Sequence, residues 1–242
     1  DVKCGSGAFM KTREDAEKLA EMMVEIGNSA GRETIALITD MRQPLGNAIG
    51  NSLEVLEAID VLKGQGPEDI TQLSVTLAGY MIYLGKKARA PREGIMMAMQ
   101  AIEDGSALEK FRTLVSGQGG DPDITEDSGL MPASRIKKDI KAKRSGYVTG
   151  LDAMRVGLAS QHAGAGREEK DDEIDLSAGI ILKKKLGDKV QCGDVLCTVC
   201  GNDELRVLAA EKEMNSVFEV NAAVREVPDL IKGIVDRTSA DR

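Results

Sequence analysis

Three stretches of the sequence combine residue types that could bind a ligand or react. Residues 5–7 read Gly-Ser-Gly after four charged and apolar residues, and a turn of small residues can cradle a phosphate. The Cys-Thr-Val-Cys run at 197–200 has the spacing of half a zinc site. The three lysines at 183–185 precede a Gly-Asp turn, where a carrier domain would present a modifiable lysine. What each stretch does depends on the element that holds it.

The Gly-Ser-Gly run lacks the companions of a phosphate loop. Neither the second half of a G-x-G-x-x-G pattern nor a following Lys-Ser/Thr pair is present. A strand that turns sharply into a helix also needs small residues. We therefore predict that residues 5–7 form the tight exit from a sheet strand.

The cysteines are predicted to be buried free thiols. The segment GDVLCTVCGN reads as a strand, and positions three apart in a strand point to opposite faces. No second Cys or His pair lies at a suitable spacing, and His162 is the only histidine. Free thiols favour a reducing compartment, so we predict a cytoplasmic location.

The lysine run is a weak signal for a carrier protein. It has no Glu/Asp-Lys-Ala or Met-Lys-Met tip around it, and its hairpin makes up only a small part of the chain. A lipoyl-like binding or carrier module is nevertheless kept as an alternative function.

The bulk composition argues against two classes of partner. The formal net charge of −8 disfavours a nucleic-acid binder, which needs a basic face to hold phosphates. No stretch approaches ~20 uninterrupted apolar residues, so we predict no contact with a membrane. The chain has no Trp and only 2% aromatic residues, so the core must be built from aliphatic side chains and Met. The Met stripe at 96, 97 and 99 is accordingly predicted to be core.

The N-terminal part of the chain predicts a βαβ unit. Residues 1–9 read as a strand and turn, and a helix follows with Thr12 as N-cap, Asp15 at the capping-box position and Gly31 near its end. The β-branched run at 34–41 is typical of a strand covered on both faces. A strand, a helix and a strand within ~40 residues predict two parallel strands joined by a right-handed crossover.

The later part of the chain changes style at a linker. Helical patterns follow one another as far as residue 117, and residues 118–132 are rich in Gly, Pro and Asp. Beyond them, short strands alternate with Gly-Asp turns around one helical segment. We predict an α/β fold with a mixed sheet and flanking helices over 1–132. An α+β module with a lipoyl-like barrel-sandwich hammerhead is predicted over 133–213, and a helical tail over 214–242.

Three motifs in order resemble one enzyme family. They are DVKCGSGAFMKT, ALITDMRQPLGNAIGNSLEVLEAIDVLKGQGPEDI and AGAGREEKDDEIDLSAGIILKKKLGDKVQCGDVL. Together they resemble the pyrimidine-nucleoside phosphorylases, relatives of thymidine phosphorylase, from residue 1 to about 213. The QPLGNAIGN segment is more similar to the branch that accepts both uridine and thymidine. A strict thymidine phosphorylase is the alternative within the family.

The resemblance implies a reaction and a setting. Members of the family use inorganic phosphate to cleave pyrimidine nucleosides to the free base and a ribose or deoxyribose 1-phosphate, as cytoplasmic homodimers in pyrimidine salvage. A phosphoribosyltransferase relative is the third possibility, but such enzymes are expected to carry an acidic diphosphate–metal motif, which the sequence lacks.

The resemblance also implies where the catalytic groups lie. In the family, the residues that grip phosphate and read the pyrimidine lie in a segment before the DVK strand. We therefore expect no catalytic residue in this chain, because those residues would lie upstream of Asp1. The chain is expected to be the C-terminal portion of a longer enzyme and to be inactive alone.

Two sets of site residues can still be carried over from the family. A potassium ion held by main-chain oxygens and one Glu maps to Leu45, Ala48 and Glu57, and a hard cation does prefer such oxygen ligands. Glu54, one turn earlier, is the competitor for the carboxylate. Phe9 and Met10 map to an apolar wall beside the pyrimidine ring, with plain core packing as the alternative.

Overall fold

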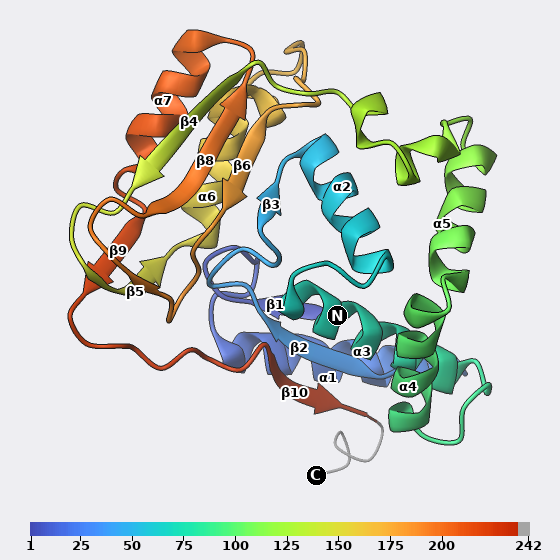
Figure 1. The fold of residues 1–242 in the computed structure, drawn as a ribbon. Helices are drawn as coiled ribbons and strands as arrows, with labels where there is room; N and C mark the ends of the chain where they lie inside the picture. The colour runs from blue at the N-terminus through green and yellow to red at the C-terminus, as the bar shows by residue number, and fades with distance from the viewer. Residues whose placement is uncertain (237–242) are drawn as a thin grey trace.

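The computed structural model describes residues 1–236, and two bodies of structure are visible in it. A small α/β part contains the N-terminus and the returning last strand, and a C-terminal module rises beside it (Figure 1). The chain crosses between them more than once, so the two parts share long-range contacts as well as a linker.

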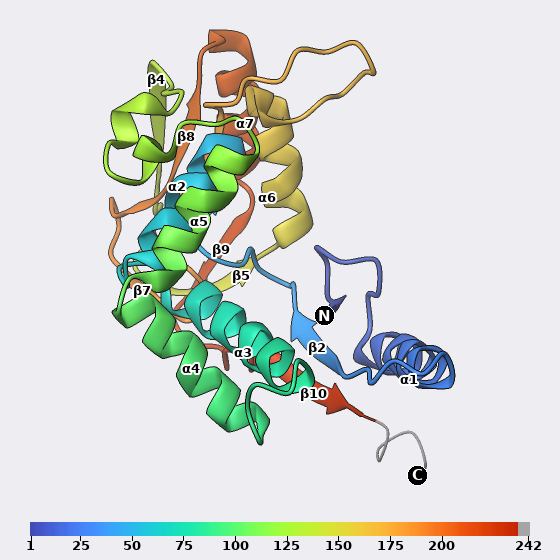
Figure 2. The ribbon, with the colours of Figure 1, turned by 90° about the vertical axis from the view of Figure 1, so that its right-hand side faces the viewer.

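The predicted βαβ unit is present. Strand β1 (Val2–Cys4) pairs in parallel with β2 (Ala36–Asp40) after helix α1 (Arg13–Ser29). Thr12 caps α1 by accepting a hydrogen bond from the Asp15 N–H at 3.2 Å, as its sequence predicts. Helix α1 packs on one side of the sheet, and α3 lies on the other side (Figure 2). The loop after β1 contains the Gly-Ser-Gly turn, and the loop after β2 leads to α2. Because β1 and β2 are parallel, both loops leave the same edge of the sheet.

Four helices follow β2 and lead away from the sheet. A short strand, β3 (Ala48–Ile49), precedes α2 (Asn51–Leu62), and then come α3 (Glu68–Leu84), α4 (Pro91–Glu103) and α5 (Ser106–Gly117). Helices α3 and α4 pack against each other as an antiparallel pair, and α5 runs back toward the module. The linker contains two short 3-10 turns, η1 (Pro122–Thr125) and η2 (Ser128–Leu130).

The C-terminal module is built on two antiparallel sheets. One has the order β3-β6-β8-β4 and the other β7-β5-β9. Their strands are β4 (Ile136–Lys141), β5 (Gly146–Leu151), β6 (Gly179–Leu182), β7 (Lys189–Val190), β8 (Val195–Gly201) and β9 (Phe218–Asn221). Helix α6 (Ala153–Ser160), the π-helical turn η3 (Gln161–Ala165) and helix α7 (Glu204–Met214) contribute buried residues to the same core as these strands.

The prediction of a helical tail over 214–242 is wrong for its described residues. Helix α7 ends at Met214, β9 then pairs with β5, and β10 (Ile231–Val235) returns to pair antiparallel with β2. The cause is visible in the sequence, because VFEV and IKGIV carry β-branched residues that favour strands despite their charged surroundings. The module therefore extends to Asn221 rather than 213, and residues 237–242 lie outside the described residues.

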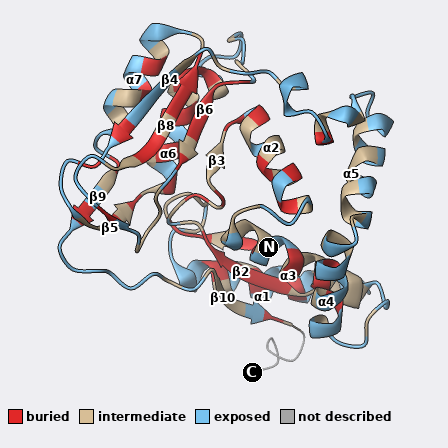
Figure 3. Cartoon of the chain, viewed as in Figure 1, coloured by how far each residue is buried: buried red, intermediate tan, exposed pale blue. Residues whose placement is uncertain are grey.

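Burial is unevenly distributed (Figure 3). Strands β6 and β8 of the module are largely buried, whereas α4 and α5 are mostly exposed or half-buried. The Met stripe predicted as core is exposed, with Met96 at 62%, Met97 at 40% and Met99 at 48%. The residues of α4 that lie against Gly79 of α3 are Gly94 and Ile95, so helical spacing alone misjudged the methionines. Among the described residues, no helix is long and apolar enough to cross a membrane.

Candidate functional site

Polar groups of the Gly-Ser-Gly turn form hydrogen bonds with neighbouring parts of the chain. The Gly5 N–H donates to the Met10 carbonyl at 3.0 Å, and the Gly7 N–H donates to the Met41 carbonyl at 2.8 Å. The Ser6 hydroxyl donates to the Arg42 carbonyl at 3.2 Å. A Cβ on Gly7 would lie 2.8 Å from the Ala153 Cβ, so the turn is a close junction with α6. These N–H groups are therefore not available to cradle a phosphate.

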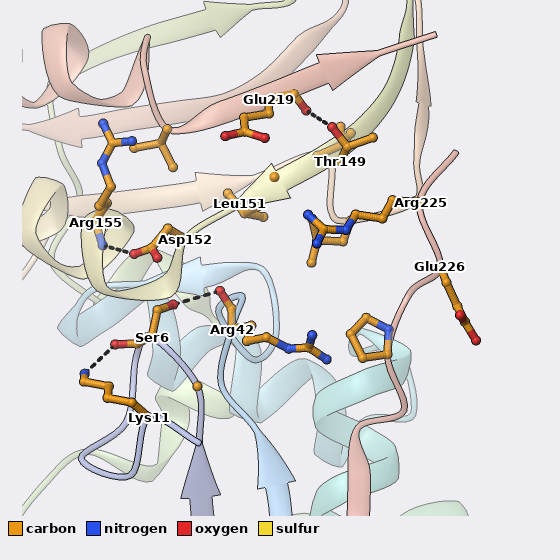
Figure 4. Close-up of a pocket in the computed structure, with 17 residues that line it drawn as sticks. Ser6, Lys11, Arg42, Thr149, Leu151, Asp152, Arg155, Glu219, Arg225 and Glu226 are labelled. Carbon is orange, nitrogen blue, oxygen red and sulfur yellow. Dashed lines mark hydrogen bonds between the residues drawn. The ribbon is translucent and has the colours of Figure 1, made fainter. Parts of the chain in front are cut away.

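A cleft of about 690 Å³ lies between this turn and the module (Figure 4). Its charged lining residues are of both signs and come from both parts of the chain: Lys11, Arg42, Arg155, Arg225, Asp152, Glu219 and Glu226. The Lys11 ammonium donates to the carbonyls of Ser6 and Ala8, and the Arg155 guanidinium donates to Ser216. The cleft therefore does not concentrate one sign of charge as a dedicated anion site would.

The two residues assigned to the pyrimidine wall, Phe9 and Met10, differ in how far they are buried. The Phe9 side chain is 97% exposed in this structure. Met10 is half-buried and packs on the small core of β1, β2 and α1. Their contact with a base stays a prediction.

The loop between β2 and α2 is shaped around the carboxylate of Glu57. Gly46 has φ of +67°, and a Cβ there would lie 2.1 Å from Glu57 Oε2, so only Gly fits. The N–H groups of Asn47 and Ala48 donate to Glu57 Oε1 at 2.8 and 3.0 Å. Burial raises the pKa of Glu57, and the nearby Asp69 raises it further, against the opposing effect of these N–H groups and of Lys185. The buried carboxylate of Glu57 therefore holds the turn at 46–48 in place.

The structure separates the two glutamates that compete for the site. Glu57 is 8% exposed and faces the loop. Glu54 is exposed and accepts a hydrogen bond from the Gly50 N–H at 3.1 Å, at the start of α2. Glu54 therefore acts as a local cap of its own helix, and only Glu57 is directed at the loop that contains Leu45 and Ala48.

Two further charged groups complete the site, and sequence analysis missed both. Asp69, at the start of α3, accepts a hydrogen bond from the Gly46 N–H at 3.2 Å. Lys185 reaches in from the turn after β6, where its ammonium donates to the carbonyls of Pro44 and Gly46 at 2.7 and 2.9 Å and pairs with Asp69. The only sequence signals were an Asp near a helix start and one lysine in a run of three.

The donor set of this loop fits a monovalent cation. Asp69 pairs with the Lys185 ammonium, whereas Glu57 accepts backbone N–H groups and has no ion pair among the described residues. Glu57 Oε2 lies in the space that a side chain at Gly46 would fill. Carboxylate and carbonyl oxygens are hard ligands, and they suit an alkali cation rather than a soft transition metal.

The cysteines of the Cys-Thr-Val-Cys run and His162 lie outside this loop. Cys197 and Cys200 are buried in β8, and burial raises the pKa of the Cys197 thiol to about 12. His162 Nδ1 lies 2.8 Å from a carboxylate oxygen of Glu213 on α7. Over residues 1–236, no group of three or more Cys, His, Asp or Glu side chains is arranged to hold a metal ion.

Comparisons with known proteins agree with this division of the chain. Residues 147–221 match the family described as "Pyrimidine nucleoside phosphorylase C-terminal domain", and residues 1–108 match "Glycosyl transferase family, a/b domain". The pyrimidine-nucleoside phosphorylases of Staphylococcus aureus strains bovine RF122 / ET3-1 and USA300 are each 53% identical over 202 residues. That alignment covers 84% of this chain and 47% of each relative, so the chain spans about half the length of the curated relatives it matches.

Proposed function

The chain belongs to the pyrimidine-nucleoside phosphorylase family, and we propose that it takes part in the phosphorolysis of pyrimidine nucleosides. The substrates would be uridine, thymidine or deoxyuridine with inorganic phosphate, and the products the free base and a ribose or deoxyribose 1-phosphate. The observation that carries the proposal is the 53% identity over 202 residues, which spans both parts of the chain.

The reaction sets electrostatic demands that these residues meet only in part. Positive charge develops on the sugar and negative charge on the leaving base, while phosphate must be held in line behind C1′, so positioning and preorganised charges carry the catalysis. The N–H groups of Gly5 and Gly7 are hydrogen-bonded within the fold, and the nearby cleft is of mixed charge. We infer that the groups which grip phosphate lie outside these 242 residues.

The loop around Glu57 is the part of the site that this chain supplies. We infer that the main-chain oxygens of Leu45 and Ala48 and the Glu57 carboxylate hold a potassium ion. The bound ion would pair with the Glu57 carboxylate, which has no ion pair among the described residues. Glu57 would then do two things, because it also orders the turn through the N–H groups of Asn47 and Ala48.

Several finer features are proposed on the same basis. The two antiparallel sheets of the module support a barrel-sandwich hammerhead, and the four free cysteines support a reducing, cytoplasmic setting. We infer that the functional protein is a homodimer. The lipoyl-like carrier alternative gains nothing, because the Lys185 side chain is 17% exposed and points into the loop instead of standing at an open tip.

A chimera tests the proposed reaction. The part of the Staphylococcus aureus enzyme that does not align with this chain is fused to these 242 residues, and release of uracil from uridine is followed by chromatography. We expect release that requires phosphate, and no release from the 242-residue chain alone. A folded chimera without phosphorolysis would refute the proposal, and robust phosphorolysis by the chain alone would refute the inferred place of the phosphate-binding groups.

A thermal melt tests the cation site without any substrate. The melting temperature of the chain is compared in potassium chloride and tetramethylammonium chloride at equal ionic strength. A bound ion stabilises the folded state in proportion to the logarithm of its concentration. We expect stabilisation by potassium in the wild type and in Glu54→Gln, and its loss in Glu57→Gln. Equal stabilisation of Glu57→Gln would contradict the assignment.

A further inference from the structure

The ammonium of Lys185 lies inside the loop of the candidate cation site, although Lys185 belongs to the C-terminal module. An ammonium carries three protons. Each of them has an acceptor: the Pro44 carbonyl at 2.7 Å, the Gly46 carbonyl at 2.9 Å, and the carboxylate of Asp69. The Lys185 side chain is only 17% exposed and that of Asp69 29%. The loop thus surrounds a positive charge that comes from far along the chain.

The backbone that presents this ammonium is fixed on both sides. The Lys185 N–H donates to Asp188 Oδ2 at 2.8 Å, and the Asp188 N–H donates back to the Lys185 carbonyl at 3.1 Å. The next residue, Leu186, donates its N–H to Gln43 Oε1 at 3.0 Å. A closed turn therefore delivers the ammonium to one place, and the adjacent residue is tied to the same loop.

The contacts of this ammonium are those of an alkali ion. Two carbonyl oxygens and a carboxylate are hard ligands for a compact cation. The N–H groups of Gly46, Asn47 and Ala48 face Asp69 and Glu57, while the carbonyls on either side of Leu45 face Lys185. The loop is therefore held between anions on its N–H side and a cation on its carbonyl side.

We propose that Lys185 is a positioning residue that acts as the built-in cation of loop 43–46, where it fastens the C-terminal module to the loop beside the Glu57 site. The proposal rests on the proposed function in that this neighbouring site is the one assigned to potassium. Lys185 neutralises Asp69 and fixes the carbonyls of Pro44 and Gly46, so that the Leu45 backbone between them is already in place.

The proposal has a consequence that a simple tether would not have. Removal of the ammonium leaves two carbonyls and a carboxylate without their donor, and unsatisfied buried polar groups are costly. A free ammonium or potassium ion is small enough to take the vacated place among these oxygens. Tetramethylammonium is larger and has no N–H group, so it cannot replace the side chain.

The experiment measures the melting temperature of Lys185→Ala, without nucleoside or phosphate, at constant ionic strength. In tetramethylammonium chloride we expect a fall of roughly 4–8 °C relative to the wild type. In ammonium or potassium chloride the variant should regain at least half of that fall. Its melting temperature should rise with the logarithm of cation concentration about twice as steeply as the wild type, because two ions bind instead of one.

Matched variants separate this role from the loss of any lysine. Lys184→Ala removes the neighbouring ammonium, for which the described residues show no hydrogen bond, and should melt like the wild type in every salt. Lys185→Arg keeps the charge but not the compact three-proton geometry, so it should be destabilised, and it should respond to the choice of cation no more strongly than the wild type does through the Glu57 site. If Lys185→Ala is unfolded in tetramethylammonium chloride, circular dichroism should show that it folds when ammonium chloride is added.

Three results would overturn the proposal. They are a wild-type melting temperature for Lys185→Ala, an equal recovery in all three salts, and an unfolded variant that ammonium does not fold. Rescue together with an inactive chimera would count against the proposed reaction alone. Loss of rescue together with an active chimera would count against the role of Lys185 alone.

Discussion

The C-terminal module and the α/β part differ in how much of themselves they bury. The module closes two sheets and two helices around fully buried residues such as Val148, Ile180 and Val199. The α/β part has a small core around β1, β2 and α1, and in the part of the chain that the structure describes α5 has no buried residue. The first region can hold its shape through its own core, whereas the second depends on fewer contacts.

The difference shows why the candidate site lies where it does. Its loop belongs to the thinly packed part, yet β3 pairs with β6 and Lys185 bonds the loop carbonyls, so the well-packed module holds it. A ligand-binding loop needs rigid elements around it to keep its geometry. The C-terminal module supplies this rigidity, which the α/β part alone does not.

The largest expected contrast is in the reactivity of the thiols. With a pKa of about 12, Cys197 is ionised to only about one part in 10⁴ at pH 8, and it is also buried in the module core. Cys4 is buried in the smaller core and Cys192 is exposed. In pulse labelling with N-ethylmaleimide followed by mass spectrometry, we expect Cys192 to react first. Cys4 should follow on local opening, and Cys197 and Cys200 should react last, on the order of 100-fold more slowly than Cys4.

The comparison fails if Cys4 and Cys197 are labelled at the same rate. Such a result would mean that both cores open together, as one cooperative unit. A parallel run in denaturant gives the control, because all four thiols should then react at rates within a few-fold of one another.

The next contrast is between two truncations to Ala. Ile180 is fully buried in the module and its truncation should lower the free energy of unfolding by about 2–5 kcal/mol. Met96 is 62% exposed on α4, so Met96→Ala should change it by less than about 0.5 kcal/mol. Urea unfolding followed by circular dichroism measures both. A cost for Met96→Ala close to that for Ile180→Ala would show that α4 is packed against something in solution.

The elements were more predictable than the site. The βαβ unit followed from local signals, such as the Thr12 cap and the β-branched run at 34–41, because these act within a few residues. Lys185 meets Gly46 across 139 positions, and no periodicity or spacing reports such a contact. Strand β10 was missed for the same reason, since its partner β2 lies at the other end of the chain. The resemblance pointed to Glu57, but the charged side chains of Asp69 and Lys185 beside its loop became visible only in the fold.

The third contrast is between two glycines. Gly46→Ala places a Cβ against the Glu57 carboxylate at φ of +67°, so we expect a loss of about 1–3 kcal/mol in the free energy of unfolding. Gly117 has no atom within 4 Å of an added Cβ, and Gly117→Ala should be neutral or stabilising by up to about 1 kcal/mol. Chemical denaturation of the two variants side by side is the measurement. A neutral Gly46→Ala would mean that the turn is less tightly held than its hydrogen bonds indicate.

The smallest contrast is between two ion pairs. Arg13 and Glu17 pair at 2.7 Å on the surface of α1, where their side chains are 56% and 38% exposed, so Glu17→Gln should cost only about 0.3–0.5 kcal/mol. Salt screens exposed charges, and the effect should vanish at high ionic strength. The Lys185–Asp69 pair is more buried and also satisfies two carbonyls, so the destabilisation caused by Lys185→Ala should persist in concentrated tetramethylammonium chloride. If both variants lose their effect in that salt, Lys185 contributes ordinary surface charge, and the module does not hold the loop through it.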